Sequence, residues 1–111
     1  MEIMKYFRKL ITEKERDGLP ENVILIDVRS HTEYKFSHFV DAISLPMNQI
    51  GEAIADIVPD KFYPIIVYCQ SGIRSGTAKI QLSRLGYTNV FNGGGIETFS
   101  LRMKYQIVCG K

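Results

Sequence analysis

Two short runs of the sequence, residues 23–26 and 65–68, consist of large apolar side chains with no polar residue among them. The alternation expected of a half-exposed strand is absent, so both runs predict strands that are covered on both faces, as in a parallel sheet. Between them, the apolar residues at 50, 53, 54 and 57 have helical spacing. Strands that alternate with helices predict an α/β fold, an open twisted parallel sheet with helices on both faces.

Weaker patterns locate the remaining elements. Ser30 and Glu33 have the spacing of a capping box, which predicts a short helix to about Tyr34. We also expect a first helix over residues 3–11, a strand at 42–45, a helix that buries Ala78, Leu82 and Leu85 and ends at Gly86, and a last strand at 89–91.

Length and charge limit the possible classes of protein. A chain of 111 residues is sized for one core, so we expect a single domain over residues 1–111. Its net charge is only +2 and its charges are scattered, so nucleic acid is not an expected partner. The first ten residues lack the continuous apolar stretch that is typical of a signal peptide, and no run approaches the ~20 apolar residues of a membrane span. We therefore predict a cytoplasmic protein with no membrane partner, in which Cys69 and Cys109 are separate thiols.

Polar segments begin where three predicted strands end, at Asp27, Cys69 and Asn92. In an open parallel sheet, ligands bind beyond the carboxyl ends of the strands. The sequence therefore predicts a binding site along this edge. Asp27 and Arg29 are expected to form a structural pair there rather than to contact substrate.

The segment at the second of these positions reads Cys69-Gln70-Ser71-Gly72-Ile73-Arg74-Ser75. A strand-end cysteine taken alone is most often a small buried hydrophobe. Here, however, a glycine that can turn backbone N–H groups inward, a helix start and a cation follow it, and these features lower the pKa of a thiol. Cys69 is thus predicted to be a nucleophile. Two directions are open for Arg74, into the pocket or against the back of the loop.

Two anion chemistries use a cysteine in such a cradle: phosphate hydrolysis and sulfur transfer. Arg74 is the fifth residue after Cys69, which gives Cys-x4-Arg, whereas the cysteine phosphatases that this loop resembles have Cys-x5-Arg. The shorter ring suits one sulfur atom on the cysteine better than a tetrahedral phosphate. Sulfur transfer is therefore preferred over phosphatase or arsenate reductase activity.

The sequence resembles the single-domain rhodaneses, the thiosulfate sulfurtransferase family. The loop 69–75 matches the family pattern Cys-x-x-Gly-x-Arg-Ser at every fixed position. Similar segments follow the same order in this chain: residues 26–30 with Glu33 and Tyr34, His38 with Ala42, Ile43 and Pro46, and the run 92–95. A departure lies around His38, where the family usually has Gly-His-Ile-Pro-Gly-Ala and this chain has Ser37, Val40 and Asp41 in place of the two glycines and the proline. Phe99 stands where the family tends to have a tryptophan.

The resemblance implies a sulfurtransferase that carries sulfur as a Cys69 persulfide, without a metal or an organic cofactor. Its expected partners are a small donor such as thiosulfate and a thiophilic acceptor, either cyanide, a small thiol or a thioredoxin-like protein. Residues 70–75 would hold the persulfide, with Asp27, Arg29 and His38 behind them. His38 is expected to fix a turn rather than to carry protons, and Cys109 to lie in a frayed tail. The alternative is a rhodanese-like binding or sulfur-relay module without turnover.

Overall fold

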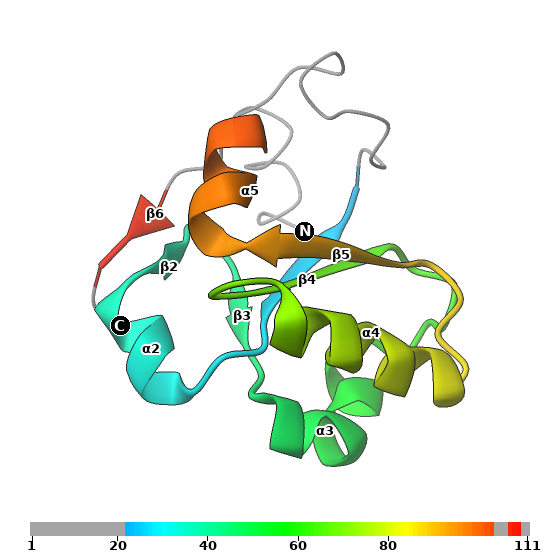
Figure 1. The fold of residues 1–111 in the computed structure, drawn as a ribbon. Coiled ribbons are helices and arrows are strands. Elements are labelled where there is room, and N and C mark those ends of the chain that lie inside the picture. The colour runs from blue at the N-terminus through cyan, green and yellow to red at the C-terminus, as the bar shows by residue number, and fades with distance from the viewer. Residues whose placement is uncertain (1–21, 104–106, 110–111) are drawn as a thin grey trace.

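The structure, a computed structural model, describes residues 22–103 and 107–109. Its centre is a parallel sheet with the strand order β3-β1-β4-β5 (Figure 1). The strands are β1 (Ile24–Asp27), β3 (Ile43–Ser44), β4 (Ile65–Cys69) and β5 (Val90–Gly95). All three pairings are parallel, so the predicted α/β fold with a parallel sheet is confirmed.

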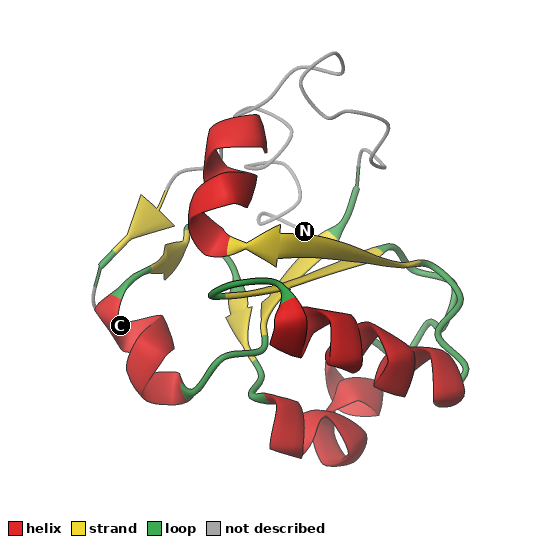
Figure 2. Cartoon of the chain, in the orientation of Figure 1, coloured by secondary structure: helices red, strands yellow, loops and turns green. Residues whose placement is uncertain are grey.

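Helices cover both faces of this sheet, with α3 (Ile50–Ile57) and α4 (Ile73–Arg84) on one face and α5 (Ile96–Met103) on the other (Figures 1 and 2). Successive side chains of the central strands enter two separate apolar clusters. Ile24, Ile26, Ile65 and Val67 pack in the cluster that contains Leu82 of α4. Leu25, Ile66 and Tyr68 belong to the other cluster, together with Phe39, Ile96 and Phe99. This two-sided burial explains why the central strands are apolar at every position.

A second, two-stranded sheet was not predicted. In it, β2 (His38–Phe39) pairs antiparallel with β6 (Ile107–Val108). The helix α2 (His31–Phe36) leads into β2, and the 3-10 helix η1 (Met47–Gln49) precedes α3. The strand β6 ends at Val108, and Cys109, which was expected in a frayed tail, follows this paired strand as an exposed free thiol.

Most predicted boundaries lie close to the observed ones. The capping box of Ser30 and Glu33 is present, and α2 extends two residues beyond Tyr34. Gly86 has a φ of +99° directly after α4, as predicted for a left-handed position. The prediction that Leu85 is buried is wrong, because this residue ends the helix and is 38% exposed. The helix expected over residues 3–11 lies outside the described residues. None of the helices in the described part of the chain is long and apolar enough to cross a membrane.

The strand β5 is longer than predicted and contains an irregularity. Val67 is opposite Asn92, and the next residue of β4, Tyr68, is opposite Gly94. One extra residue, Gly93, therefore bulges from β5, and Gly94 has a φ of +87°. Bulges of this kind redirect neighbouring side chains and are frequent beside active sites.

Candidate active site

Cys69 is the last residue of β4, at the carboxyl edge of the sheet. The parallel register places Asp27 opposite Tyr68 on one side of β4 and Gly95 opposite Cys69 on the other. The polar segments predicted to meet at this edge therefore do meet there. The loop that follows β4 leads directly into the start of α4 (Figure 1).

Backbone N–H groups of the loop surround the Cys69 sulfur. The Gly72 N–H donates to Sγ at 2.9 Å, and the Ser75 N–H donates to it at 3.4 Å. Gly72 can turn inward because its φ is +99°, a left-handed conformation that side chains rarely adopt. Gly72, the N-cap residue of α4, has no side chain that could accept these N–H groups. The loop thus presents fixed donors to whatever charge the sulfur carries.

These donors change the acidity of Cys69. Burial by itself raises the pKa of the thiol, because the charged form loses hydration. Hydrogen bonds from the Ser75 side chain and from the backbone of Ser75, Gly72 and Ser71 favour the thiolate and outweigh burial. The net effect is a pKa of Cys69 below its ordinary value, as a nucleophile requires.

Ser75 lies fully buried beneath the loop, beside Asn92 of β5. Its Oγ is 3.5 Å from the Cys69 sulfur and donates to Asn92 Oδ1 at 2.6 Å. Asn92 Oδ1 also accepts the Gly94 N–H at 2.9 Å. The bulge of β5 therefore brings an amide side chain into contact with the loop, a contact that the sequence analysis did not identify.

Arg74 binds Glu33 on α2. Its two terminal nitrogens donate to the two carboxylate oxygens of Glu33 at 2.8 and 2.9 Å. These hydrogen bonds from Arg74, with smaller contributions from Ser30, hold the pKa of Glu33 at about 2. Of the two directions left open by the sequence, Arg74 takes the one that braces the loop.

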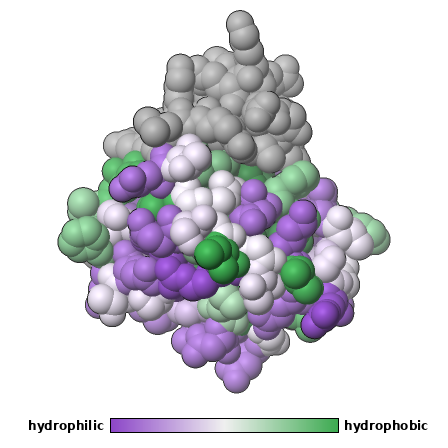
Figure 3. Space-filling model, in the orientation of Figure 1, coloured by the Kyte–Doolittle hydropathy of each residue, from purple (hydrophilic) through white to green (hydrophobic). Residues whose placement is uncertain are grey.

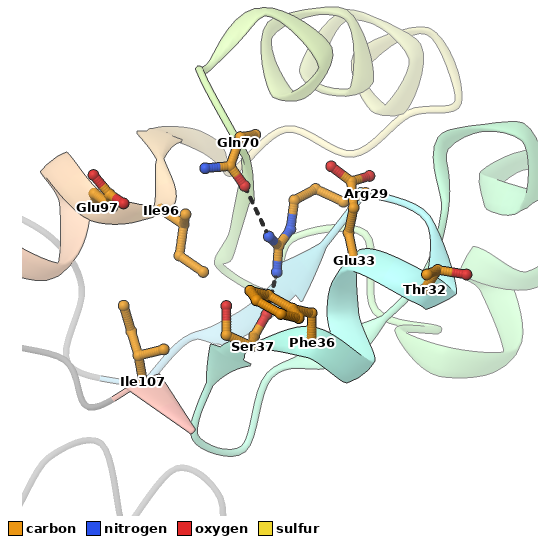
Figure 4. A pocket seen from close by; sticks show the side chains of 9 residues that line it. All are labelled: Arg29, Thr32, Glu33, Phe36, Ser37, Gln70, Ile96, Glu97 and Ile107. Carbon is orange, nitrogen blue, oxygen red and sulfur yellow. Dashed lines mark hydrogen bonds between the residues drawn. The ribbon is translucent and has the colours of Figure 1, made fainter. Parts of the chain in front are cut away.

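Asp27 and Arg29 form the structural pair that was expected. The carboxylate and guanidinium are 2.7 Å apart, with side chains 0% and 3% exposed. Arg29 also donates to Gln70 Oε1 at 3.0 Å and to the Ser37 carbonyl (Figure 4). One buried cation therefore connects β1, the loop after β4 and the end of α2.

His38 contributes to the turn rather than to the loop around Cys69. Its Nδ1 donates to the Tyr34 carbonyl at 2.6 Å, and its ring stacks on Tyr34 with centroids 3.6 Å apart. The turn that follows is closed by the Ala42 N–H, which donates to the Phe39 carbonyl. Asp41 in this turn has a φ of +67°, so this aspartate adopts the left-handed conformation that the usual glycine would supply.

The glycines after Asn92 allow close contact between β5 and the loop. A Cβ added to Gly95 would lie 2.7 Å from the Gln70 carbonyl oxygen, and one added to Gly93 would lie 3.1 Å from Phe99. Phe99 itself is 1% exposed and packs edge-on against Phe39. Close packing accounts for Gly93 and Gly95, whereas Gly94 adopts a left-handed φ of +87°.

A cavity of about 600 Å³ opens beside the loop (Figure 4). Gln70 and Arg29 form one side of it, and Phe36, Ile96 and Ile107 add apolar surface. The complete lining is Arg29, Thr32, Glu33, Phe36, Ser37, Gln70, Ile96, Glu97 and Ile107. Cys69 is 0% exposed and does not line this cavity. This cavity therefore extends to Gln70, the residue after Cys69, and not to the sulfur itself.

The surface near α4 is mainly polar with separate apolar residues, as the front face in Figure 3 shows. Ile73 and Ile80 of α4 are 77% and 55% exposed. Among the described residues, no three histidine, cysteine, aspartate or glutamate side chains gather as a metal site would require.

Comparison with known proteins agrees with this geometry. The family model described as the rhodanese-like domain matches residues 5–101. The chain belongs to the rhodanese family. Thiosulfate sulfurtransferase PspE of Escherichia coli is 43% identical over 76 residues, which are 68% of this chain and 73% of PspE. A solved structure described as an E. coli rhodanese with anions has a TM-score of 0.72 and 40% identity, over 79% of this chain and 99% of that one.

Rhodanese-like segments also occur inside larger enzymes. The tRNA uridine(34) hydroxylase of Buchnera aphidicola is 41% identical over 81 residues, which are 68% of this chain. The rhodanese described here spans only 26% of the length of that hydroxylase.

Proposed function

We propose that this rhodanese is a sulfurtransferase that moves a sulfane sulfur from thiosulfate, or a related donor, to a thiophilic acceptor through a persulfide on Cys69. The cradle of Gly72 and Ser75 N–H groups around the Cys69 sulfur is the observation that carries this proposal. The similarity to PspE, a thiosulfate sulfurtransferase, supports it.

The reaction has two displacement steps. The Cys69 thiolate attacks the outer sulfur of thiosulfate, the S–S bond of thiosulfate breaks, and sulfite leaves with the bonding electrons. The product, Cys69–S–S⁻, carries its charge on the outer sulfur. The acceptor then attacks this outer sulfur and restores the Cys69 thiolate; with cyanide, the product is thiocyanate. No net oxidation of the protein occurs, so no organic cofactor or metal is needed.

The protein stabilises the same kind of charge throughout both steps. Thiolate and persulfide are both anions held by fixed N–H donors, which need no rearrangement as the charge moves from one sulfur to the next. Arg74 does not bind the donor directly in this proposal. It orients the loop through Glu33, and its positive charge is coupled electrostatically to Cys69.

The decisive experiment is turnover of thiosulfate and cyanide, followed as thiocyanate. Cys69→Ser should abolish the activity, whereas Cys109→Ser, which alters the exposed thiol, should retain it. Mass spectrometry after thiosulfate alone should find one added sulfur on the peptide that contains Cys69. Added sulfur on Cys109 instead, or thiocyanate formation by Cys69→Ser, would overturn the assignment.

A sulfur-relay module without efficient turnover is the second candidate. The match to one segment of a tRNA uridine(34) hydroxylase supports it, because the rhodanese-like segment there is part of a larger protein. A relay would load one sulfur from a persulfide donor and pass it to a partner thiol, yet turn over poorly with cyanide. Transfer of ³⁵S from loaded protein to a thioredoxin-like protein, compared with transfer to cyanide, distinguishes the two candidates. A cytoplasmic location, where both thiols stay reduced, is part of either proposal.

A further inference from the structure

The hydroxyl of Ser75 has three acceptors within reach. Its Oγ lies 2.6 Å from Asn92 Oδ1, 3.1 Å from the Gly72 carbonyl oxygen and 3.5 Å from the Cys69 sulfur. A hydroxyl carries one hydrogen and therefore donates to one of them at a time. The contact with Asn92 is the shortest of the three, at the short end of the range for O–H···O bonds.

The orientation of the Asn92 amide is fixed by its other neighbours. The Gly94 N–H donates to Oδ1 at 2.9 Å, and Nδ2 donates to the Gly72 carbonyl at 3.4 Å. An amide flipped by 180° would lose both bonds, because its NH2 group would face the Gly94 N–H and its oxygen would face the Gly72 carbonyl oxygen. The oxygen of Asn92 therefore points at the Ser75 hydroxyl.

We propose that Asn92 is a positioning residue that competes with the Cys69 sulfur for the hydrogen of the Ser75 hydroxyl. While Cys69 is a thiol, Asn92 Oδ1 holds this hydrogen, and Ser75 Oγ is free to accept the S–H of Cys69. When Cys69 loses its proton, the hydroxyl rotates and donates to the thiolate, while Asn92 Oδ1 keeps the Gly94 N–H. Asn92 thus favours the thiol form and sets how strongly Ser75 supports the anion.

The charges near Cys69 are independent of this exchange. Arg74 on α4 is electrostatically coupled to Cys69 and is held by Glu33 of α2. Asp27 and Arg29 after β1 are paired with each other. The strand β5, which carries Asn92, contains no charged residue between Val90 and Gly95. Replacing Asn92 with alanine leaves all of these charges in place.

The pKa of Cys69 in Asn92→Ala distinguishes two roles of Asn92: competition for the Ser75 hydrogen, and support of the loop conformation. Under competition, the freed hydroxyl donates to the thiolate, and the pKa of Cys69 falls by about half a unit to one unit. If Asn92 only held the loop in shape, its loss would turn fewer N–H groups toward the sulfur, and the pKa of Cys69 would rise.

The test measures the pH dependence of iodoacetamide alkylation of Cys69 in the full chain, with Cys109→Ser so that a single thiol reacts. Four proteins are compared, all with Cys109→Ser: the otherwise unaltered chain, Asn92→Ala, Ser75→Ala, and the double variant Asn92→Ala/Ser75→Ala. We expect the downward shift only where Ser75 is present. An unchanged or raised pKa, or the same shift in both backgrounds, would overturn the proposal.

Asn92→Asp provides a second variant that retains an acceptor at this position. A carboxylate holds the hydroxyl hydrogen more tightly and adds a negative charge, so the pKa of Cys69 should rise by about one unit or more. In Ser75→Ala, this rise should shrink to the part caused by charge alone. An equal rise in both backgrounds would contradict the competition, even if Asn92→Ala failed to fold.

The proposal concerns the acidity of the thiol and can fail or succeed whether or not the protein transfers sulfur. Its consequence for turnover rests on the proposed function. A thiolate of lower pKa is a weaker nucleophile but a better leaving group. Asn92→Ala should therefore slow persulfide formation relative to sulfur release in single-turnover measurements.

Discussion

Arg74 and Glu33 are 41 residues apart in the sequence, and their side chains form a two-pronged ion pair that joins the start of α4 to α2. The loop after Cys69 is thereby attached to a helix that precedes it in the chain by three strands. The charge of Arg74 is already compensated before any substrate binds.

Glu33→Gln should reduce the free energy of unfolding by about 0.5 to 1 kcal/mol at pH 7, since the pair is partly exposed. Arg74 lowers the pKa of Glu33 from 4.5 to about 2 in the folded state. The contribution is therefore complete above about pH 4.5 and is lost as the pH falls toward 2. Urea unfolding of both proteins between pH 5 and pH 2 should show their difference shrinking.

Glu52→Gln, an exposed acidic position on α3, is the matched control for this change. Its effect should be small at every pH. A Glu33→Gln difference that stayed constant down to pH 2 would contradict the role assigned to the ion pair.

Alkylation of Cys69 should depend on pH with a midpoint below the 9.0 of an ordinary thiol, because the loop donors favour the thiolate. The measurement uses Cys109→Ser and follows the rate of reaction with iodoacetamide. Ser75→Ala, which removes one donor and retains the backbone N–H groups, should move the midpoint upward. A midpoint at or above 9 in the unaltered loop would show that burial dominates instead.

Arg29→Gln should destabilise the fold by about 3 to 5 kcal/mol, because it leaves the carboxylate of Asp27 buried without a charged partner. Denaturant titration measures this loss. The double variant Asp27→Asn/Arg29→Gln removes both charges and should lose less than the sum of the two single variants. Simple additivity would mean that the two side chains stabilise the protein independently.

Asp41→Gly should raise the free energy of unfolding, by up to about 1 kcal/mol. A φ of +67° is unfavourable for aspartate, and glycine removes that strain at the cost of a more flexible unfolded chain. Thermal unfolding provides the measurement, and Asp41→Ala is the control that should lower stability. A lower melting temperature for Asp41→Gly would show that the aspartate side chain stabilises the turn.

Gly95→Ala should disturb the active-site loop, because its new methyl group would lie 2.7 Å from the Gln70 carbonyl oxygen. We expect loss of most thiocyanate-forming activity and a raised pKa of Cys69 as the cradle opens. Gly51→Ala in α3 is the same substitution where no atom lies closer than 3.9 Å, and it should be neutral or slightly stabilising. Full activity in Gly95→Ala would mean that the loop tolerates displacement.

The parts of the fold that could be predicted from the sequence are those with strong local patterns. The central strands have uninterrupted apolar runs, and the loop after Cys69 has a fixed spacing of glycine and arginine. By contrast, β2 and β6 have two residues each, too few for any period to be recognised, and their pairing joins distant parts of the chain. The helix α5 was not predicted either, and β5 extends beyond Phe91 into glycines that seldom form strands.

Long-range partners of the site residues were also inaccessible to sequence reasoning. Glu33 was identified as part of a capping box and of a family-like segment, and the structure shows that the same carboxylate binds Arg74. Asn92 was identified as the start of a polar segment and of the family-like run 92–95, without a partner. Its contact with Ser75 depends on the bulge at Gly93, and no local sequence pattern predicts this bulge.

The N-cap residue of α4 is Gly72, which has no side chain to accept the free N–H groups of the first turn. In α2, the Ser30 side chain accepts a backbone N–H of the first turn. In α4, the Cys69 sulfur takes this place, because it accepts the N–H groups of Gly72 and Ser75. Cys69, the proposed nucleophile, therefore also caps the N-terminus of the helix.

A cap that ionises makes the stability of the helix respond to the state of the sulfur. Because folding lowers the pKa of Cys69, the thiolate contributes stability that is complete above the pKa of the unfolded thiol and is lost as the pH falls through the folded value. Any reaction that neutralises this sulfur removes the cap charge. The melting temperature of the protein should thus report the chemical state of the Cys69 sulfur.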